Sequence, residues 1–132
     1  MNKWRSGFEA SVFDRLPRGT KYEPEKFRFP VSHPLYRCRG CGSKDVQRTT
    51  SYIPDFRLPN GTWIEAKGIL TSGNRRNLVA FKAHFPDIQL RIVFEADNLL
   101  AKKAKSRYSD WAEKAGFEYC IGFRNIPKEW FQ

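Results

Sequence analysis

Long apolar segments are missing from this sequence. Nowhere do about eighteen apolar residues follow one another, and the first ten residues lack the apolar core of a secretion signal. Only three cysteines occur, two of them in one short motif, which excludes a secreted disulfide framework. Internal repeats and low-complexity stretches are also missing. These absences predict a soluble, cytoplasmic protein that makes no membrane contact.

Positive charge is what the sequence has in excess. Its 132 residues include 24 Lys and Arg but 14 Asp and Glu, which gives a net charge of +10. Such a balance favours a polyanionic partner, most commonly nucleic acid, although an anionic membrane or a mitochondrial presequence also requires basic residues. Because the basic residues are spread over the whole chain, nucleic acid is the partner we expect. The length fits a single domain, residues 1–132, which oligomerisation would supplement.

The apolar pattern predicts an α/β fold. Ser6 is the predicted N-cap of a first helix, in which Phe8, Val12, Phe13 and Leu16 share one face. The extended segment 20–31, interrupted by prolines, reads as an edge strand, and a tail at 125–131 is expected to pack its aromatic residues on the body. The order of elements predicts a mixed β-sheet flanked by helices. The other predicted elements are strands at 51–58, 62–67, 88–96 and 117–123 and helices at 75–84 and 108–115.

A hairpin is predicted at "SYIPDFRLPNGTWIEAKG", residues 51–68. Its three-residue turn Pro59-Asn60-Gly61 combines a fixed φ, a tolerant second position and a glycine for positive φ. That turn pairs Phe56 with Ile64 and sets Asp55 opposite Glu65. Lys67 then lies on the face of Glu65, about 6–7 Å further on, because side chains alternate along a strand. One face of the hairpin is predicted to be core and the other to carry chemistry.

Two carboxylates facing each other destabilise a hairpin unless a positive group neutralises them. Carboxylate oxygens with water in the remaining positions suit Mg²⁺ or Mn²⁺ and leave room for a substrate phosphate. The alternative is a solvated face whose charges keep the hairpin soluble. Spacing alone leaves both interpretations open.

Pro54-Asp55 followed by Glu65-Ala66-Lys67 resembles the PD-(D/E)XK signature of the restriction-endonuclease-like superfamily. With "RSGFE" before it and "LRIVF" and "IPKEW" after it, the chain resembles the phage endonuclease I family of Holliday-junction resolvases from about Arg5 to Trp130. The resemblance implies a restriction-endonuclease-like core and an intertwined, domain-swapped homodimer that cuts branched DNA with Mg²⁺ or Mn²⁺ during recombination, in the host cytoplasm if the protein is phage-encoded.

The same resemblance implies the site residues. Asp55 and Glu65 correspond to metal ligands, and Lys67 to the group that orients or deprotonates the attacking water or stabilises the developing charge. Glu9 corresponds to a further catalytic carboxylate and metal ligand, which the family supplies from the partner subunit, and Glu23 to a secondary acidic position. As an alternative for Glu9, Ser6-x-x-Glu9 is also a capping box of the first helix.

The segment 32–48 departs from the family pattern because "CRGCGS" is inserted there. Cys38 and Cys41 have the spacing of a zinc knuckle, but one knuckle supplies only two of four ligands. Two knuckles of a dimer could share one Zn²⁺, or His33, His84 or Cys120 could complete a site within one chain. Reduced cysteines or a labile disulfide are the remaining interpretations.

We expect basic residues outside the acidic cluster to bind the substrate. With no base-reading helix in the sequence, we expect recognition of DNA through its backbone and shape, with binding that weakens steeply with salt. Site-specific nicking or homing cleavage of duplex DNA is the alternative activity, and a non-catalytic DNA-binding module is the alternative class. The candidate DNA-binding residues are Arg5, Lys44, Arg48, Arg75, Arg76 and Lys82.

Overall fold

The computed structural model describes residues 4–32 and 47–132. Three α-helices, seven strands and two 3₁₀-helices occur in these ranges. No helix in this part of the chain is long and apolar enough to cross a membrane. In chain order the elements are α1 (Gly7–Arg15), β1 (Lys21–Tyr22), β2 (Phe27–Ser32), β3 (Gln47–Tyr52), β4 (Phe56–Arg57), β5 (Trp63–Lys67), α2 (Ser72–His84), β6 (Leu90–Phe94), α3 (Tyr108–Ala115), β7 (Glu118–Ile121), η1 (Phe123–Asn125) and η2 (Lys128–Phe131).

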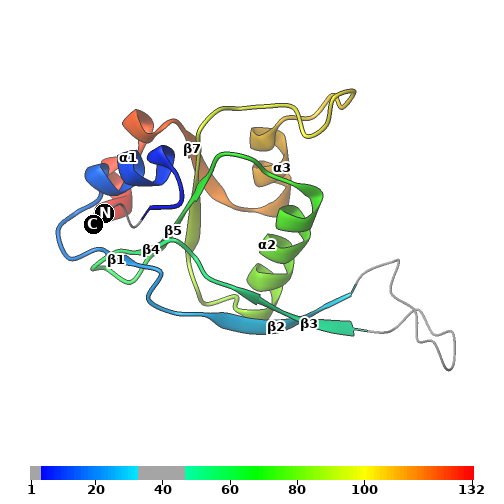
Figure 1. The fold of residues 1–132 in the computed structure, drawn as a ribbon, viewed down its shortest axis with the longest axis horizontal. Helices are drawn as coiled ribbons and strands as arrows, with labels where there is room; N and C mark the ends of the chain where they lie inside the picture. Colours follow the sequence, from blue (N-terminus) through cyan, green and yellow to red (C-terminus); the bar gives the residue numbers. More distant parts are fainter. Residues whose placement is uncertain (1–3, 33–46) are drawn as a thin grey trace, which may run out of the picture.

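The main sheet has five strands in the order β1-β4-β5-β6-β7. β1, β4 and β5 pair antiparallel, whereas β5, β6 and β7 run parallel. β2 and β3 form a separate antiparallel pair below α2 (Figure 1). The predicted α/β class with a mixed sheet is therefore confirmed.

Helices cover both faces of the main sheet. α1 lies on one side, and α2 and α3 lie on the other (Figure 1). Ile64 and Ala66 of β5 pack into the cluster beside α1, while Trp63 of the same strand packs into the cluster beside α2 and α3. The face of β5 that carries Glu65 also contributes to the core, because Trp63 on that face is only 3% exposed.

The predicted strand at 51–58 is in fact two strands. Tyr52 ends β3 opposite Phe27, whereas Phe56 begins β4 between Tyr22 and Ile64. The three residues between them, with Pro54 at the centre, carry the chain from the small sheet into the main one. Five strands therefore precede α2 instead of the predicted three.

The predicted edge strand at 20–31 is also divided. β1 is the edge of the main sheet, and residues 23–26, which include Pro24, separate it from β2. Pro30 does not interrupt β2, in which it lies opposite Thr49. A two-stranded sheet tolerates this proline because each of its strands has one edge without ladder hydrogen bonds.

Several other predictions are confirmed. The Ser6 hydroxyl accepts a hydrogen bond from the backbone N–H of Glu9 at 3.2 Å and so caps α1. α3 ends at Gly116, whose φ of 84° is favourable for glycine. β7 is an edge strand, as predicted. Trp130 of the tail is buried at 6% exposure.

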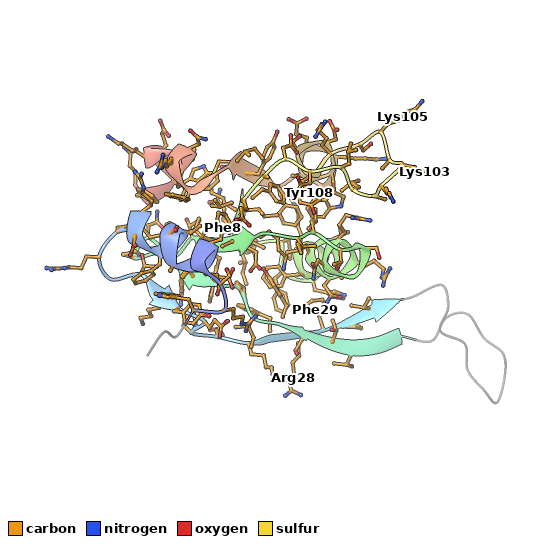
Figure 2. All side chains as sticks on the ribbon, turned by 45° about the horizontal axis from the view of Figure 1, so that its top comes forward. Phe8, Arg28, Phe29, Lys103, Lys105 and Tyr108 are labelled. Carbon is orange, nitrogen blue, oxygen red and sulfur yellow. The ribbon has the colours of Figure 1, made fainter. Side chains whose placement is uncertain are left out.

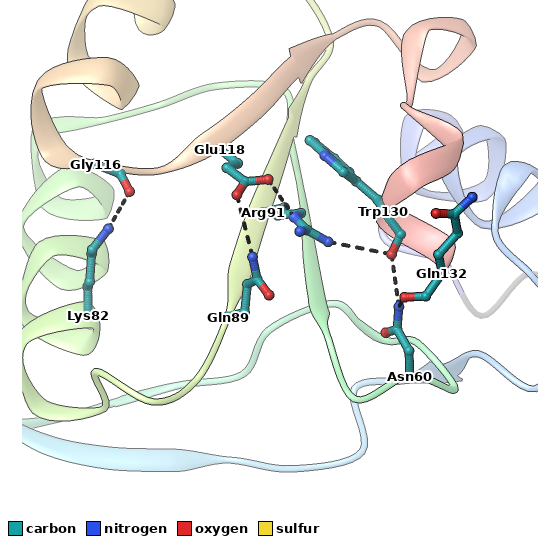
Figure 3. A network of polar contacts seen from close by, with 8 residues as sticks. All are labelled: Asn60, Lys82, Gln89, Arg91, Gly116, Glu118, Trp130 and Gln132. Carbon is teal, nitrogen blue, oxygen red and sulfur yellow. Dashed lines mark hydrogen bonds and ion pairs between the residues drawn. The ribbon is translucent and has the colours of Figure 1, made fainter.

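The hairpin turn is joined to this tail. The amide of Asn60 donates to the backbone oxygens of Trp130 and Gln132 at 3.0 and 2.8 Å. Arg91 lies over the Trp130 ring and forms an ion pair with Glu118 at 2.8 Å (Figure 3). Contacts between distant parts of the chain therefore fix the turn that sets the register of β4 and β5.

Candidate active site

The turn between β4 and β5 has the predicted geometry. Leu58 donates from its backbone N–H to Thr62 at 2.8 Å, so that residues 59–61 form a three-residue loop. Gly61 has a φ of 90°, as that loop requires. Phe56 lies opposite Ile64, in the predicted register. The position of Asp55 relative to Glu65 follows from this register.

Asp55 is a buried carboxylate directly before β4. Its side chain is 3% exposed and accepts a hydrogen bond from the backbone N–H of Ala66 at 2.8 Å. Burial, and then the negative charge of Glu65, raise the pKa of Asp55 to about 9. A buried carboxylate with so high a pKa is one that a cation would stabilise strongly.

Glu9 and Glu23 bring two more carboxylates to Asp55. One oxygen atom of each of the three residues lies within 4.8 Å of the other two. Glu9 reaches this cluster from α1 and is 5% exposed. Glu23 follows β1, where its backbone N–H donates to the Asp55 carbonyl at 2.7 Å. We call Glu9, Glu23 and Asp55 the carboxylate cluster.

The backbone of Glu23 is unusual. Its φ of 46° is the only positive value for a non-glycine residue in the described part of the chain. Such a conformation costs about 1–3 kcal/mol and persists only where the surroundings hold it. Arg5 Nη2 lies 2.6 Å from Glu23 Oε1 in an ion pair, although this buried oxygen accepts no aligned hydrogen bond. The strain therefore falls on a residue of the carboxylate cluster.

The capping box predicted for Glu9 forms only in part. Ser6 caps the N–H of Glu9, but the Glu9 carboxylate accepts its hydrogen bond from the N–H of Arg5, at 2.7 Å. The Tyr22 hydroxyl lies 3.5 Å from the same Glu9 oxygen. Glu9 thus caps the turn before α1 while its carboxylate belongs to the cluster.

Glu65 and Lys67 adjoin the carboxylate cluster from β5. Lys67 Nζ lies 3.4 Å from Glu65 Oε2, and the Tyr52 hydroxyl donates to Glu65 Oε1 at 2.6 Å. Burial raises the pKa of Glu65 despite the opposing effect of Lys67. Burial also raises the pKa of Tyr52 well above its ordinary value, so the phenol stays protonated and remains a donor.

A cavity of about 260 Å³ opens beside Glu65 and Lys67. Residues from four parts of the chain line it, so a substrate group could enter between the N-terminal segment, the small sheet, β5 and α2. The lining residues are Arg5, Ser51, Tyr52, Ile53, Glu65, Lys67, Asn74, Asn77 and Leu78.

The predicted DNA-binding residues differ in their positions. Arg5 lines this cavity, and its side chain is 65% exposed. Arg75 donates to the Leu70 carbonyl at 3.1 Å, and Arg76 is exposed on α2. Lys82, near the other end of α2, donates to the Gly116 carbonyl (Figure 3). It also lies over the Phe117 ring. Arg48 lies in β3, opposite Val31.

The predicted zinc knuckle lies outside the described residues, as do Cys38, Cys41, His33 and Lys44. Of the other conceivable ligands, Cys120 is 8% exposed in the core, and burial raises the pKa of its thiol to about 12. His84 lies near the Phe29 ring. Among the described residues, the carboxylate cluster is the one group of three or more potential ligands.

Tyr52 and Asn77 were not predicted from the sequence. Tyr52 precedes Asp55 by three residues, and its role depends on the bend that brings β3 beside β5. Asn77 is half-buried on the cavity side of α2. The available signal was its place beside the buried face of α2, directly before Leu78 and four residues before Phe81. An asparagine on a helix is, however, most often a solvated residue.

The donor set fits a hard divalent cation. Three carboxylate oxygens from separate parts of the chain converge, and two of the three residues are buried. The pKa of Asp55 is raised far above its usual range. Oxygen ligands of this kind suit Mg²⁺ or Mn²⁺.

Comparisons with known proteins place the sequence among phage endonucleases. A family model described as phage endonuclease I matches residues 1–132. Endonuclease I of Escherichia phage T7 is 30% identical over 131 residues, which are 98% of this chain and 78% of that protein. Endodeoxyribonuclease 1 of Enterobacteria phage T3 is 32% identical over 115 residues, which are 86% of this chain and 68% of that protein.

Proposed function

Since the chain belongs to the phage endonuclease I family, we propose that it is a metal-dependent endonuclease that hydrolyses phosphodiester bonds of branched DNA. The observation that carries this proposal is the carboxylate cluster beside Glu65 and Lys67, the two residues of β5 that line a cavity. A solvated hairpin face, the alternative for these charges, would not bury Asp55 and Glu65 to 3% and 4% exposure.

Mg²⁺ or Mn²⁺ is the cofactor that we propose for the cluster. When bound, such an ion supplies positive charge at the phosphate and a more acidic water. Asp55, Glu9 and Glu23 would hold it, with Glu65 adjacent. One ion or two are both compatible with this set of carboxylates.

Lys67 is proposed to act on the phosphate or on the attacking water. Its Nζ is held 3.4 Å from Glu65, and its side chain is 20% exposed, so it faces both the acids and the cavity. An ammonium at this point neutralises negative charge that develops on the phosphate oxygens. Tyr52 fixes the carboxylate that orients Lys67.

We also propose that the protein works as an intertwined homodimer. Within one chain, α1 places Glu9 beside Asp55. If two copies exchanged their N-terminal segments, each contact of Glu9 with Asp55 would be preserved between subunits. Two sites in one dimer would allow cuts in opposing strands of a junction.

A zinc ion bound by Cys38 and Cys41 is a further proposal. Two knuckles sharing one ion would give four thiolates, the number that a structural site requires. Metal analysis of the purified protein tests this. One zinc per two chains supports the shared site, one per chain supports a site closed within the chain, and none removes the proposal.

A cleavage assay with Mg²⁺ on a four-way junction, a linear duplex and plasmid DNA tests the function. We expect cuts near the branch point, loss of cutting in the Asp55→Asn variant, and retention of DNA binding by that variant. Preference for one duplex sequence would replace junction cleavage with homing or site-specific nicking. Absence of cutting by the unsubstituted protein, with DNA binding that Asp55→Asn leaves intact, would instead indicate a non-catalytic DNA-binding module.

A further inference from the structure

Residues 96–107 form an exposed loop between β6 and α3, which we call the basic arm. Its tip is Ala101-Lys102-Lys103-Ala104-Lys105-Ser106. We propose that the three lysines bind the sugar-phosphate backbone of the duplex next to the cut. The inference rests on the proposed DNA substrate and assigns a separate contact for it, outside the catalytic cavity and outside the predicted DNA-binding residues.

Internal hydrogen bonds give the basic arm a defined shape. Leu99 and Arg107 form an antiparallel bridge, and the N–H of Leu100 donates to the Ser106 carbonyl at 2.9 Å. Closer to the tip, the N–H of Ala104 donates to the Ala101 carbonyl at 3.0 Å. A loop that is already ordered loses less conformational entropy when it binds.

The base of the arm is tied to α3. Asp97 accepts hydrogen bonds from the N–H and the hydroxyl of Ser109 at 2.9 and 2.6 Å. The Arg107 guanidinium donates to the Asp97 carbonyl at 2.8 Å. Asp97, the acidic residue within the arm, is therefore directed to α3, and its charge does not meet the lysines at the tip.

The charges at the tip are available to a ligand. Lys102, Lys103 and Lys105 are exposed, and none of the three forms an ion pair within the described parts of the chain. Lys103 and Lys105 point away from the protein body (Figure 2). Three like charges within four residues repel one another, so an anionic partner relieves a cost that the free protein carries.

The sheet topology places the base of the arm beside Lys67 of the candidate active site. β5 and β6 are parallel, with Lys67 opposite Phe94, so both strands end at the same edge of the sheet. The N–H of Glu95, the next residue, donates to the Lys67 carbonyl at 3.0 Å. From that edge the arm extends over α3, to the upper right of Figure 1. DNA bound at Lys67 would pass this edge.

The chemistry of the tip favours phosphates over bases. Lysine is a compact charge on a flexible stem and contacts phosphate without sequence preference. Ala104 lies between the lysines, and Ala101 and Ser106 flank them; these small residues let a DNA backbone approach closely. The tip has no amide or aromatic side chain to read or stack on a base. We therefore expect the arm to grip branched and linear DNA alike.

The test compares two triple variants in the full-length protein carrying Asp55→Asn, which prevents cutting. One contains Lys102→Ser, Lys103→Ser and Lys105→Ser. The matched control removes the same charge at Arg18, Lys26 and Lys128, which are exposed residues after α1, before β2 and in η2. α1 and β1 lie on the side of the molecule away from the arm (Figure 1). Binding to a labelled four-way junction is measured by fluorescence anisotropy over a range of salt concentrations.

Each lost phosphate contact lowers the slope of log K against log salt by about 0.9. We expect the arm variant to lose about 2–3 units of slope and to bind about tenfold or more weakly at low salt, on junction and linear DNA alike. The control should change both quantities little. Equal losses in the two variants, or an unchanged arm variant, would overturn the proposal.

Thermal unfolding shows whether both variants remain folded. Failure of the proposed function gives a different result from failure of the arm. In the first case, the protein without any substitution cuts neither junction nor duplex. In the second case, it cuts, and the lysines at the tip contribute nothing to binding.

Discussion

Asp55→Asn should make the metal-free protein more stable while abolishing DNA cleavage. The substitution keeps the size of the side chain, and the asparagine oxygen can still accept the hydrogen bond from Ala66 that measures 2.8 Å. What it removes is a group whose negative charge is disfavoured by burial and by the neighbouring Glu65. A residue retained at a cost in stability is typical of a functional site.

The size of the effect follows from the pKa of Asp55. That pKa is about 9 in the folded protein and 3.8 in its reference state. Each pKa unit is worth about 1.4 kcal/mol. At neutral pH, Asp55 therefore lowers the free energy of unfolding by up to about 4 kcal/mol relative to a side chain that does not titrate. Entry of water and relaxation reduce this, and we expect a gain of about 2–4 kcal/mol, or roughly 5–15 °C in Tm.

The stability gained by Asp55→Asn depends on pH. Between about pH 4 and pH 9 the folded protein holds a proton on Asp55 that the unfolded chain has released. The stability of the metal-free protein with Asp55 therefore falls as pH rises through this window. The advantage of Asp55→Asn should be smallest near pH 4 and should grow with pH until it levels off near pH 9.

Differential scanning fluorimetry across this pH range, with and without Mg²⁺, measures the effect. Mg²⁺ should stabilise the protein with Asp55, by about 2.7 kcal/mol at a hundredfold excess over Kd, and should do little for Asp55→Asn. Asp14→Asn is the matched control, because Asp14 is an exposed carboxylate of α1. A metal-free Asp55→Asn protein that is less stable than the control at neutral pH would refute the reasoning.

Two further substitutions test the surroundings of the site. Tyr52→Phe removes the donor 2.6 Å from Glu65 and leaves a buried carboxylate oxygen unsatisfied, at a cost of about 1–3 kcal/mol. We expect a lower kcat and weaker Mn²⁺ binding, which calorimetry measures. An unchanged Mn²⁺ affinity would show that the contact does not position Glu65. Gly61→Ala forces alanine to a φ of 90° and should lower the free energy of unfolding, measured in urea, by about 1–2 kcal/mol. The control Gly7→Ala in α1 should leave it unchanged. Equal effects of the two substitutions would contradict the proposed strain in the turn.

The hairpin could be predicted because its information is local. Pro59-Asn60-Gly61 specifies a three-residue turn, and the turn fixes which residues of β4 and β5 face each other. The ends of α1 and α3 were also predictable, since Ser6 and Gly116 are caps with direct chemical reasons.

The division of residues 51–58 between two sheets was not predictable in the same way. Tyr52 and Phe56 both belong to apolar, extended segments, and only pairing with Phe27 and Tyr22 separates them. Those partners are distant in sequence, so hydrophobic alternation gives no sign of the break beyond Pro54. The contact of Tyr52 with Glu65 depends on this break, and so was missed with it.

The spacing of residues alone predicted only a part of the carboxylate cluster, whereas the family resemblance also pointed to Glu9 and Glu23. The spacing of the hairpin pointed to Asp55 and Glu65 as the pair that meets. In the structure, Asp55 also meets Glu9 and Glu23, whose oxygens lie within 4.8 Å of its own, while Glu65 is bonded to Tyr52 and Lys67. The position of the Glu23 carboxylate depends on the left-handed backbone conformation of this residue, which no motif in the sequence predicts.

Direct observation of the ion tests the central claim most sharply. Crystals of the protein soaked in Mn²⁺ should give an anomalous difference peak among the carboxylates of Asp55, Glu9 and Glu23, and crystals of Asp55→Asn should not. A peak of equal height in the Asp55→Asn crystals, or Mn²⁺ bound only at sites away from Asp55, would contradict the assignment of this cluster as the metal-binding centre of the nuclease.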